Sequence, residues 1–122
     1  MHHSVPSGLD ASSRARQHVR DDLTSALHPS KVIAAELMTS ELVTNAVRHA
    51  GLLEGDLIGL DIHLQPETIH VSVVDGGPGM DPDRPISGGD EGGWGLLLVD
   101  RISDRWGIRR THPHSVWFEI DR

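Results

Sequence analysis

The sequence predicts an α+β fold in which helices lie on one face of a mostly antiparallel sheet. Two helical segments come first, a β-hairpin follows them, and a further helix with one or two strands closes the chain. Helices and strands are therefore grouped, whereas a parallel sheet built from βαβ units would alternate them. The 122 residues are enough for one small domain with a single core.

The N-terminal segment is small and polar. We therefore expect residues 1–12 to be disordered and the folded domain to span residues 13–122. The segment lacks the apolar core of a signal peptide. No apolar run in the chain approaches the roughly 20 residues that a membrane span needs, so a membrane partner is not expected.

The first helix is expected to begin at Ser12 or Ser13, whose hydroxyl can cap it, and to end at Pro29. Its apolar residues recur every four positions on one face, and they are Ala15, Val19, Leu23 and Leu27. An amphipathic helix therefore opens the domain.

A second helix is expected over residues 31–50, between the capping residue Ser30 and the stop residue Gly51. Its apolar stripe consists of Ala35, Met38, Leu42 and Ala46. A polar stripe consists of Glu36, Ser40, Thr44 and Arg48. Glu41 and Asn45 fall at the border between the two stripes, where a side chain can reach a site beside the core.

Alternating apolar residues predict a β-hairpin over residues 56–77, with a turn at 65–67. The apolar positions of its strands are Ile58, Leu60, Ile62, Leu64, Ile69, Val71 and Val73. One apolar and one polar face are typical of an antiparallel sheet that is covered on one side. A glycine- and proline-rich segment over residues 76–93 follows, and it is too long for a routine turn.

The C-terminal part is expected to form a helix over residues 94–107 and one or two strands over 108–120. Val116, Phe118 and Ile120 would share one face of the last strand. Three aromatic residues are expected to anchor the core at the helix-covered face, and they are Trp106, Trp117 and Phe118.

Composition excludes several classes of function. The chain has no cysteine, which excludes disulfides and thiolate metal sites and favours a reducing cytoplasm. Its formal net charge is -7, with 11 basic and 18 acidic residues. Proteins that bind nucleic acid need a basic face to neutralise phosphates, so no nucleic-acid partner is expected. A single nucleotide held by a few local groups remains compatible with this charge.

The first motif whose residues could take part in catalysis or metal binding is Glu41-x-x-x-Asn45. Residues four apart on a helix lie about 5–6 Å from each other on the same side. A carboxylate there can act as a general base, and a carboxamide oxygen is a ligand that suits Mg²⁺. The alternative is a solvated pair at the edge of the stripe. His49, one turn further on, is a histidine at a helix end that the helix dipole also favours.

The second motif is Asp75-x-Gly77-x-Gly79, directly after an apolar strand. Glycines let the backbone approach a flat ligand, and Asp75 can accept a hydrogen bond from an exocyclic amino group such as that of adenine. The alternative is a plain turn, since Asp, Gly and Pro are common turn residues.

The third motif is a glycine cluster, Gly92, Gly93 and Gly95, that leads into a helix. Backbone N–H groups at the N-terminus of a helix bind phosphates. The spacing is not that of a P-loop, because no Gly-Lys-Ser/Thr follows. The alternative is a flexible linker with a glycine start to the helix.

The three motifs occur in an order that resembles the ATP-binding superfamily of gyrase, histidine kinases and bacterial anti-sigma-factor serine kinases. The segments that look most like the anti-sigma-factor branch are SELVTNAVRHA, VVDGGPGM, GWGLLLVDRISDRWGI and SVWFEI. The resemblance covers roughly residues 13–121. It implies a two-layer α/β sandwich with ATP between the helix layer and a loop that acts as a lid.

The resemblance also implies roles for individual residues. Glu41 becomes the catalytic base, Asn45 the Mg²⁺ ligand, and Asp75 the contact to the adenine amino group. Ser115 would occupy a hydroxyl position near the adenine on the last strand. The remaining ATP-binding positions that it implies are His49, Gly77, Gly79, Met80, Gly93, Trp94, Gly95 and Leu96.

Some positions depart from the pattern of such relatives. They often carry an arginine where this chain has Trp94, and a lysine where it has His114. The segment 80–92 is acidic, and an acidic lid repels a triphosphate unless Mg²⁺ compensates. Packing explains an aromatic residue between glycines poorly, so Trp94 is a candidate to cover the nucleotide or to contact a partner.

Three functions follow as hypotheses. The first is an Mg-ATP-dependent serine/threonine protein kinase that regulates transcription by partner switching, with a sigma factor and an anti-anti-sigma antagonist as partners and a possible homodimer. The second is a non-catalytic module that binds nucleotide or a protein partner. The third is a detached histidine-kinase catalytic domain, which ranks last because neither His18 nor His28 stands in a His-Glu or His-Asp pair.

Overall fold

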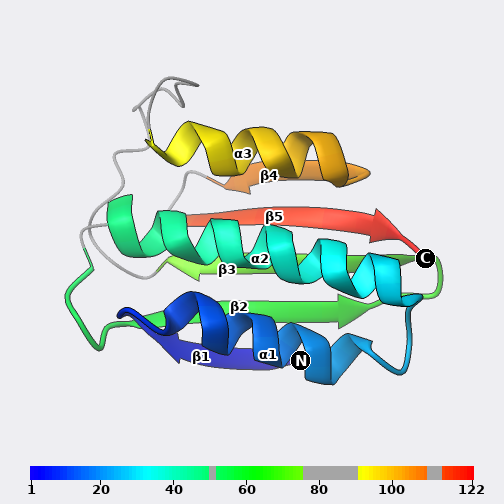
Figure 1. The fold of residues 1–122 in the computed structure, drawn as a ribbon, viewed down its shortest axis with the longest axis horizontal. Coiled ribbons are helices and arrows are strands. Elements are labelled where there is room, and N and C mark those ends of the chain that lie inside the picture. Colours follow the sequence, from blue (N-terminus) through cyan, green and yellow to red (C-terminus); the bar gives the residue numbers. More distant parts are fainter. Residues whose placement is uncertain (50–51, 76–90, 110–113) are drawn as a thin grey trace.

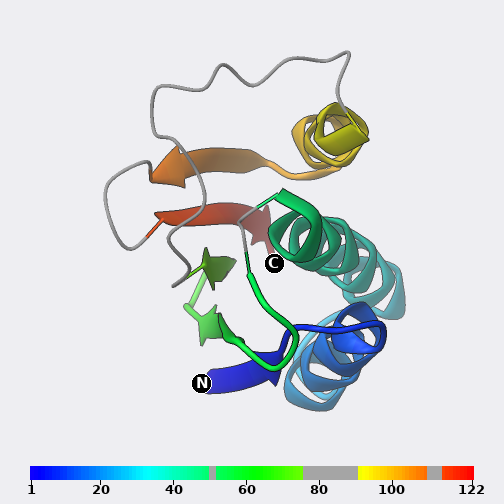
Figure 2. The same ribbon diagram turned by 90° about the vertical axis from the view of Figure 1, so that its left-hand side faces the viewer.

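The computed structural model describes residues 1–49, 52–75, 91–109 and 114–122. In these residues three helices lie above one five-stranded sheet (Figure 1). The end-on view separates the layers clearly, with all helices on the same side of the strands (Figure 2). The predicted α+β class is therefore confirmed.

The sheet contains β1 (His2–Pro6), β2 (Leu57–Leu64), β3 (Thr68–Asp75), β4 (Arg105–Arg109) and β5 (His114–Asp121), in the spatial order β1-β2-β3-β5-β4. Each neighbouring pair among these strands is antiparallel, so the described sheet is not mixed. The predicted hairpin is present as β2 and β3. The last two predicted strands are β5 and, beside it, the edge strand β4.

The strand β1 corrects the expectation that residues 1–12 are disordered. It pairs with β2 along its whole length, and Val5 is fully buried in the core. The backbone N–H of Ser7 donates to the carbonyl of Asp56 at 2.7 Å, which secures the exit from the strand. A strand of five residues with one buried apolar side chain carries no recognisable alternation. Its conformation depends on the edge that β2 offers.

The helices are α1 (Ala11–Leu23), α2 (Pro29–His49) and α3 (Glu91–Ile102). The cap position of α1 is Asp10, so neither Ser12 nor Ser13 is the cap. The helix α1 ends at Leu23, before the expected end at Pro29. Pro29 instead begins α2, in agreement with the preference of proline for the first helical position.

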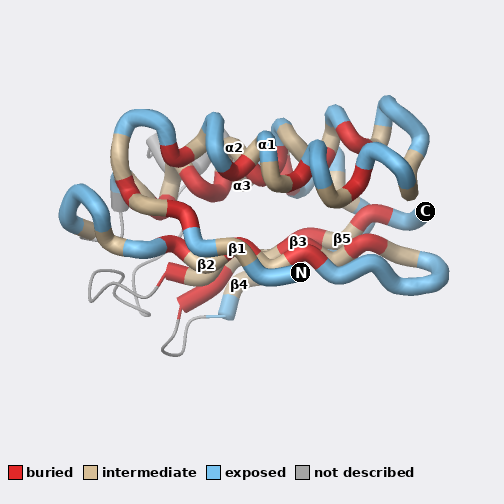
Figure 3. Tube along the Cα trace, turned by 90° about the horizontal axis from the view of Figure 1, so that it is seen from below, coloured by how far each residue is buried: buried red, intermediate tan, exposed pale blue. Residues whose placement is uncertain are grey.

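One hydrophobic core fills the space between the layers, and the tube view shows buried residues along the facing sides of both (Figure 3). Every second residue of β3 is buried, as the alternation predicts. The largest fully buried side chains are Phe118, Leu23, Met38, Ile58, Leu60, Ile62 and Ile69.

The segment after α3 differs from the prediction of a helix over 94–107. The helix ends at Ile102, and Trp106 and Gly107 lie on β4. Gly107 stands opposite Trp117, and a Cβ there would lie 2.8 Å from the Trp117 ring. The short edge strand β4 thus depends on a close approach between Gly107 and the Trp117 ring that only glycine allows. The helical periodicity of this segment hides the strand in the sequence.

Trp117 also differs from the expectation that it anchors the helix-covered face. Phe118 is fully buried beneath the helices, so its neighbour on β5 points to the opposite face. There the Trp117 ring stacks on His70 with ring centroids 5.3 Å apart. Trp106 is partly buried against the core, as expected.

Candidate functional site

The elements that carry the predicted motifs meet at one end of the domain. The C-terminal ends of α2 and β3 lie beside the first residues of α3 and β5 (Figure 1, left). Helix α2 contacts both α3 and β3. Segments far apart in the sequence are thereby assembled into one candidate site.

Glu41 and Asn45 lie on α2 at the predicted border. Both are half-buried, whereas Leu42, Val43 and Ala46 of the same turns are buried in the core. Successive turns of a helix place residues four apart side by side, about 5–6 Å between Cβ atoms. A carboxylate and a carboxamide are therefore presented together next to the core.

The polar stripe of α2 faces α1 and fixes the rotation of the helix. Ser12 bonds the hydroxyl of Thr44 at 2.7 Å, and Arg16 Nη1 donates to Ser40 Oγ at 2.9 Å. A further ion pair joins α1 to Glu36 at 2.7 Å. The sequence identified this stripe only as polar. Its contacts determine which face of α2 lies against α1.

Asp75 is the last residue of β3 and is 3% exposed. It follows Val71 and Val73 on the face that the helices cover, so the carboxylate stands at the end of an apolar surface. Burying a carboxylate is costly, and buried ionisable groups gather at functional sites, so Asp75 is a candidate site residue.

The register of β5 separates two polar residues that the sequence did not distinguish. His114 stands opposite Asp75, whereas Ser115 stands opposite Val74. Directly opposed residues share a face, so His114 lies on the helix-covered face with Asp75 and Ser115 on the other. From the sequence, His114 is marked only as a departure from the pattern of relatives. Its place beside Asp75, which makes it a further candidate site residue, depends on the pairing of β5 with β3.

The structure describes only some of the other predicted site residues. Gly77, Gly79 and Met80 lie outside the described residues. Leu96 packs partly buried against the core, in the second turn of α3. The backbones of His49, Gly93, Trp94 and Gly95 are helical, and the structure does not describe their surroundings further.

The residues of the candidate site are compatible with a Mg²⁺ ion that is bound through one oxygen atom of the protein. Among the described residues no group of three or more His, Asp or Glu side chains could hold a metal ion by itself. Magnesium commonly keeps several waters and binds one or two protein oxygens together with substrate phosphates. The half-buried amide of Asn45 is a donor of this kind.

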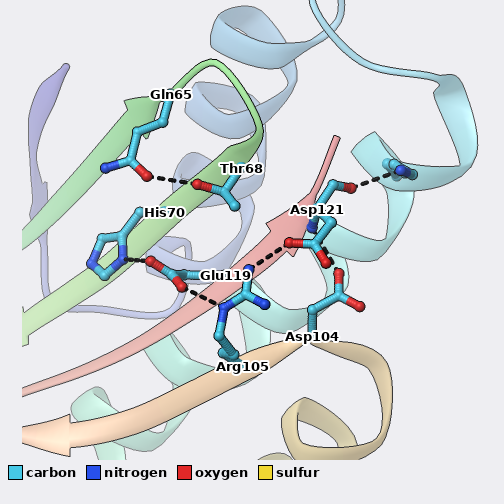
Figure 4. A network of polar contacts seen from close by, with 8 residues as sticks. Gln65, Thr68, His70, Asp104, Arg105, Glu119 and Asp121 are labelled. Carbon is cyan, nitrogen blue, oxygen red and sulfur yellow. Dashed lines mark hydrogen bonds and ion pairs between the residues drawn. The ribbon is translucent and has the colours of Figure 1, made fainter.

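The opposite end of the sheet is stabilised by a network of polar contacts (Figure 4). Arg105 Nε donates to Glu119 Oε1 at 2.8 Å, and Glu119 Oε2 contacts His70 Nδ1 at 3.0 Å. The Arg105 guanidinium, and secondarily His70, hold the pKa of Glu119 below its usual value. Lys31 of α2 donates to the carbonyl of Asp121, which ties the helix layer to β5. These contacts join β3, β4, β5 and α2 at the end of the sheet away from Asp75.

No helix among the described residues has the length and hydropathy needed to cross a membrane.

The fold agrees with comparisons to known proteins. The model of the histidine kinase-like ATPase domain family matches residues 5–118. The serine-protein kinase RsbW of Halalkalibacterium halodurans is 32% identical over 82 residues, which cover 57% of this chain and 50% of that protein. The chain thus matches about half the length of this curated relative. These findings confirm the predicted resemblance, and ATP binding is what the domain implies. Because the family model covers nearly the whole chain, the protein belongs to the histidine kinase-like ATPase domain family.

Proposed function

We propose that this protein is a regulatory serine/threonine protein kinase that transfers the γ-phosphoryl group of ATP to an antagonist protein. The observation that supports the proposal is the buried carboxylate of Asp75 at the end of β3, on the sheet face that is covered by α2, the helix that carries Glu41 and Asn45. The similarity to a serine-protein kinase supports the choice of acceptor.

Each side chain has a distinct task in this proposal. Asp75 accepts a hydrogen bond from the exocyclic amino group of adenine. The backbone N–H groups at the start of α3 bind phosphate oxygens, because the helix dipole favours negative charge there. Asn45 would hold Mg²⁺ through its amide oxygen, and the ion would supply positive charge that neutralises the phosphates.

Glu41 acts on the acceptor. The serine or threonine oxygen forms a bond to the γ-phosphorus, the bond to the bridging oxygen breaks, and ADP leaves. The hydroxyl proton passes to the Glu41 carboxylate. Such a base contributes typically 10²–10⁴-fold to the rate. Positioning of the two reactants supplies most of the remainder.

The proposed partners are a sigma factor and its anti-anti-sigma antagonist. Phosphorylation of the antagonist would free the kinase to hold the sigma factor, and a homodimer is compatible with this role. The proposed location is the cytoplasm, which the lack of cysteine supports.

The second candidate is a non-catalytic module that binds nucleotide or a protein partner. The acidic composition of residues 80–92 and the tryptophan at position 94 favour it, because neither feature stabilises a triphosphate. A detached histidine-kinase catalytic domain ranks below both candidates.

Phosphotransfer from labelled ATP to the antagonist protein distinguishes the two candidates. We expect transfer by the wild type and a rate lower by about 10²–10⁴-fold in Glu41→Gln, which keeps the shape and loses the base. The matched control is Glu67→Gln, an exposed site at the hairpin turn, at the far end of the sheet, and its rate should equal the wild type. Undiminished transfer by Glu41→Gln contradicts the proposed base. ATP binding without transfer by the wild type favours the non-catalytic module.

A further inference from the structure

The edge strand β1 has few attachments to the rest of the domain. In the described sheet it pairs with β2 alone, and it also contacts α1. Local opening is easiest at such an edge, where one neighbour supplies all the main-chain hydrogen bonds. Side-chain contacts between β1 and α1 therefore have a large influence on whether β1 stays in the sheet.

Three titratable side chains meet at the contact between β1 and α1. His3 Nε2 of β1 lies 2.7 Å from Asp22 Oδ2 of α1. The ring of His3 also stacks on the ring of His18 from the same helix, with centroids 4.0 Å apart and planes inclined by 19°. The His3 and Asp22 side chains are only 21% and 12% exposed, so water screens this cluster weakly.

The cluster disfavours a proton on His18. Burial of the imidazole lowers the pKa of His18 most, and the charge of His3 lowers it further. Asp22 and Asp21 oppose this effect, and Arg14 adds to it. The charges that act on His18 thus come from its own helix and from β1. Both the burial by the stacked ring and the charge of His3 depend on the docking of β1.

We propose that His3, His18 and Asp22 form a proton-sensitive latch that holds β1 in the sheet near neutral pH and loosens it in mild acid. A histidine with a lower pKa when β1 is docked binds its proton more readily when β1 is released. The docked state therefore loses stability as the pH falls through 6.5, the ordinary pKa of the side chain. This loss is complete once the pH is below the docked-state pKa.

Release of β1 has a defined structural consequence. Val5 would leave the core, and its partner Ile58, fully buried in the docked state, would become exposed. The main chain of β2 would then form the edge of the sheet, with hydrogen-bonding groups open to an extended segment. The latch thus controls which strand forms this edge, independently of nucleotide binding.

Hydrogen exchange of the full chain, measured by mass spectrometry between about pH 7.5 and pH 5.5, tests the latch. Rates are corrected for the intrinsic pH dependence, and peptides of β1 are compared with those of β3. We expect a severalfold fall in β1 protection in the wild type, because each unit of pKa depression is about tenfold in the opening equilibrium. In His18→Phe, which keeps a stacked ring without a titrating group, β1 protection should stay constant. The same fall in both proteins, or constant β1 protection in the wild type, overturns the proposal.

Two further variants make the result independent of how well His18→Phe folds. His63→Gln removes an exposed histidine from the neighbouring strand β2 and should retain the wild-type fall. His3→Ala removes both the ring stack and the Asp22 contact, so β1 protection should drop at neutral pH while β3 protection is unchanged. Unchanged β1 protection in His3→Ala also overturns the proposal.

Discussion

Asp75→Asn is expected to weaken ATP binding by about 10- to 150-fold. A hydrogen bond to a charged group contributes about 1.5–3 kcal/mol, and the amide would also turn an N–H group towards the adenine amino group. Because Asp75 is 3% exposed, water cannot replace the lost acceptor. Isothermal titration of the variant with Mg-ATP measures the change in Kd.

The control for this prediction is a carboxylate on the other face of the sheet. Asp61 of β2 contacts His2 at 2.6 Å on the open face, away from the helices. Asp61→Asn should bind ATP as the wild type does. Equal affinity in Asp75→Asn and the wild type would show that the adenine is recognised elsewhere.

Phe118→Ala is expected to cost about 3–5 kcal/mol of the free energy of unfolding. Phe118 is fully buried and lies between Val71 of β3 and Trp106 of β4, so its removal leaves a cavity at the centre of the sheet. Chemical denaturation followed by circular dichroism gives the difference.

The adjacent residue provides the control for the packing argument. Trp117→Ala removes a larger side chain from the open face, where it is half-buried against His70. We expect a clearly smaller loss of stability than in Phe118→Ala. Equal losses would mean that the two faces of β5 contribute alike, against the observed layering.

The parts of the fold with strong periodicity could be predicted from the sequence. The alternation of β2 and β3, and the four-residue spacing on α1 and α2, depend on burial on one side, which a sequence records directly. The border position of Glu41 and Asn45 follows from the same spacing. The sequence alone therefore places these two residues at the border of the apolar stripe.

Other features depend on contacts between distant segments. The strand β1 forms by pairing with the edge of β2. The strand β4 can pair closely with β5 after α3 because Gly107 has no side chain to collide with the Trp117 ring. The pairing of His114 with Asp75 is likewise a matter of register. The alternation of Val116, Phe118 and Ile120 places His114 on their face, but no local pattern determines which residue of β3 it faces.

The binding of Mg-ATP by the wild-type protein is the most direct test of the central claim, that α2 and the end of β3 form a nucleotide site. Thermal unfolding is recorded with and without the nucleotide. At a concentration of 100 times the Kd, Mg-ATP should stabilise the native state by about 2.7 kcal/mol. No change in the unfolding temperature at millimolar Mg-ATP would contradict the claim.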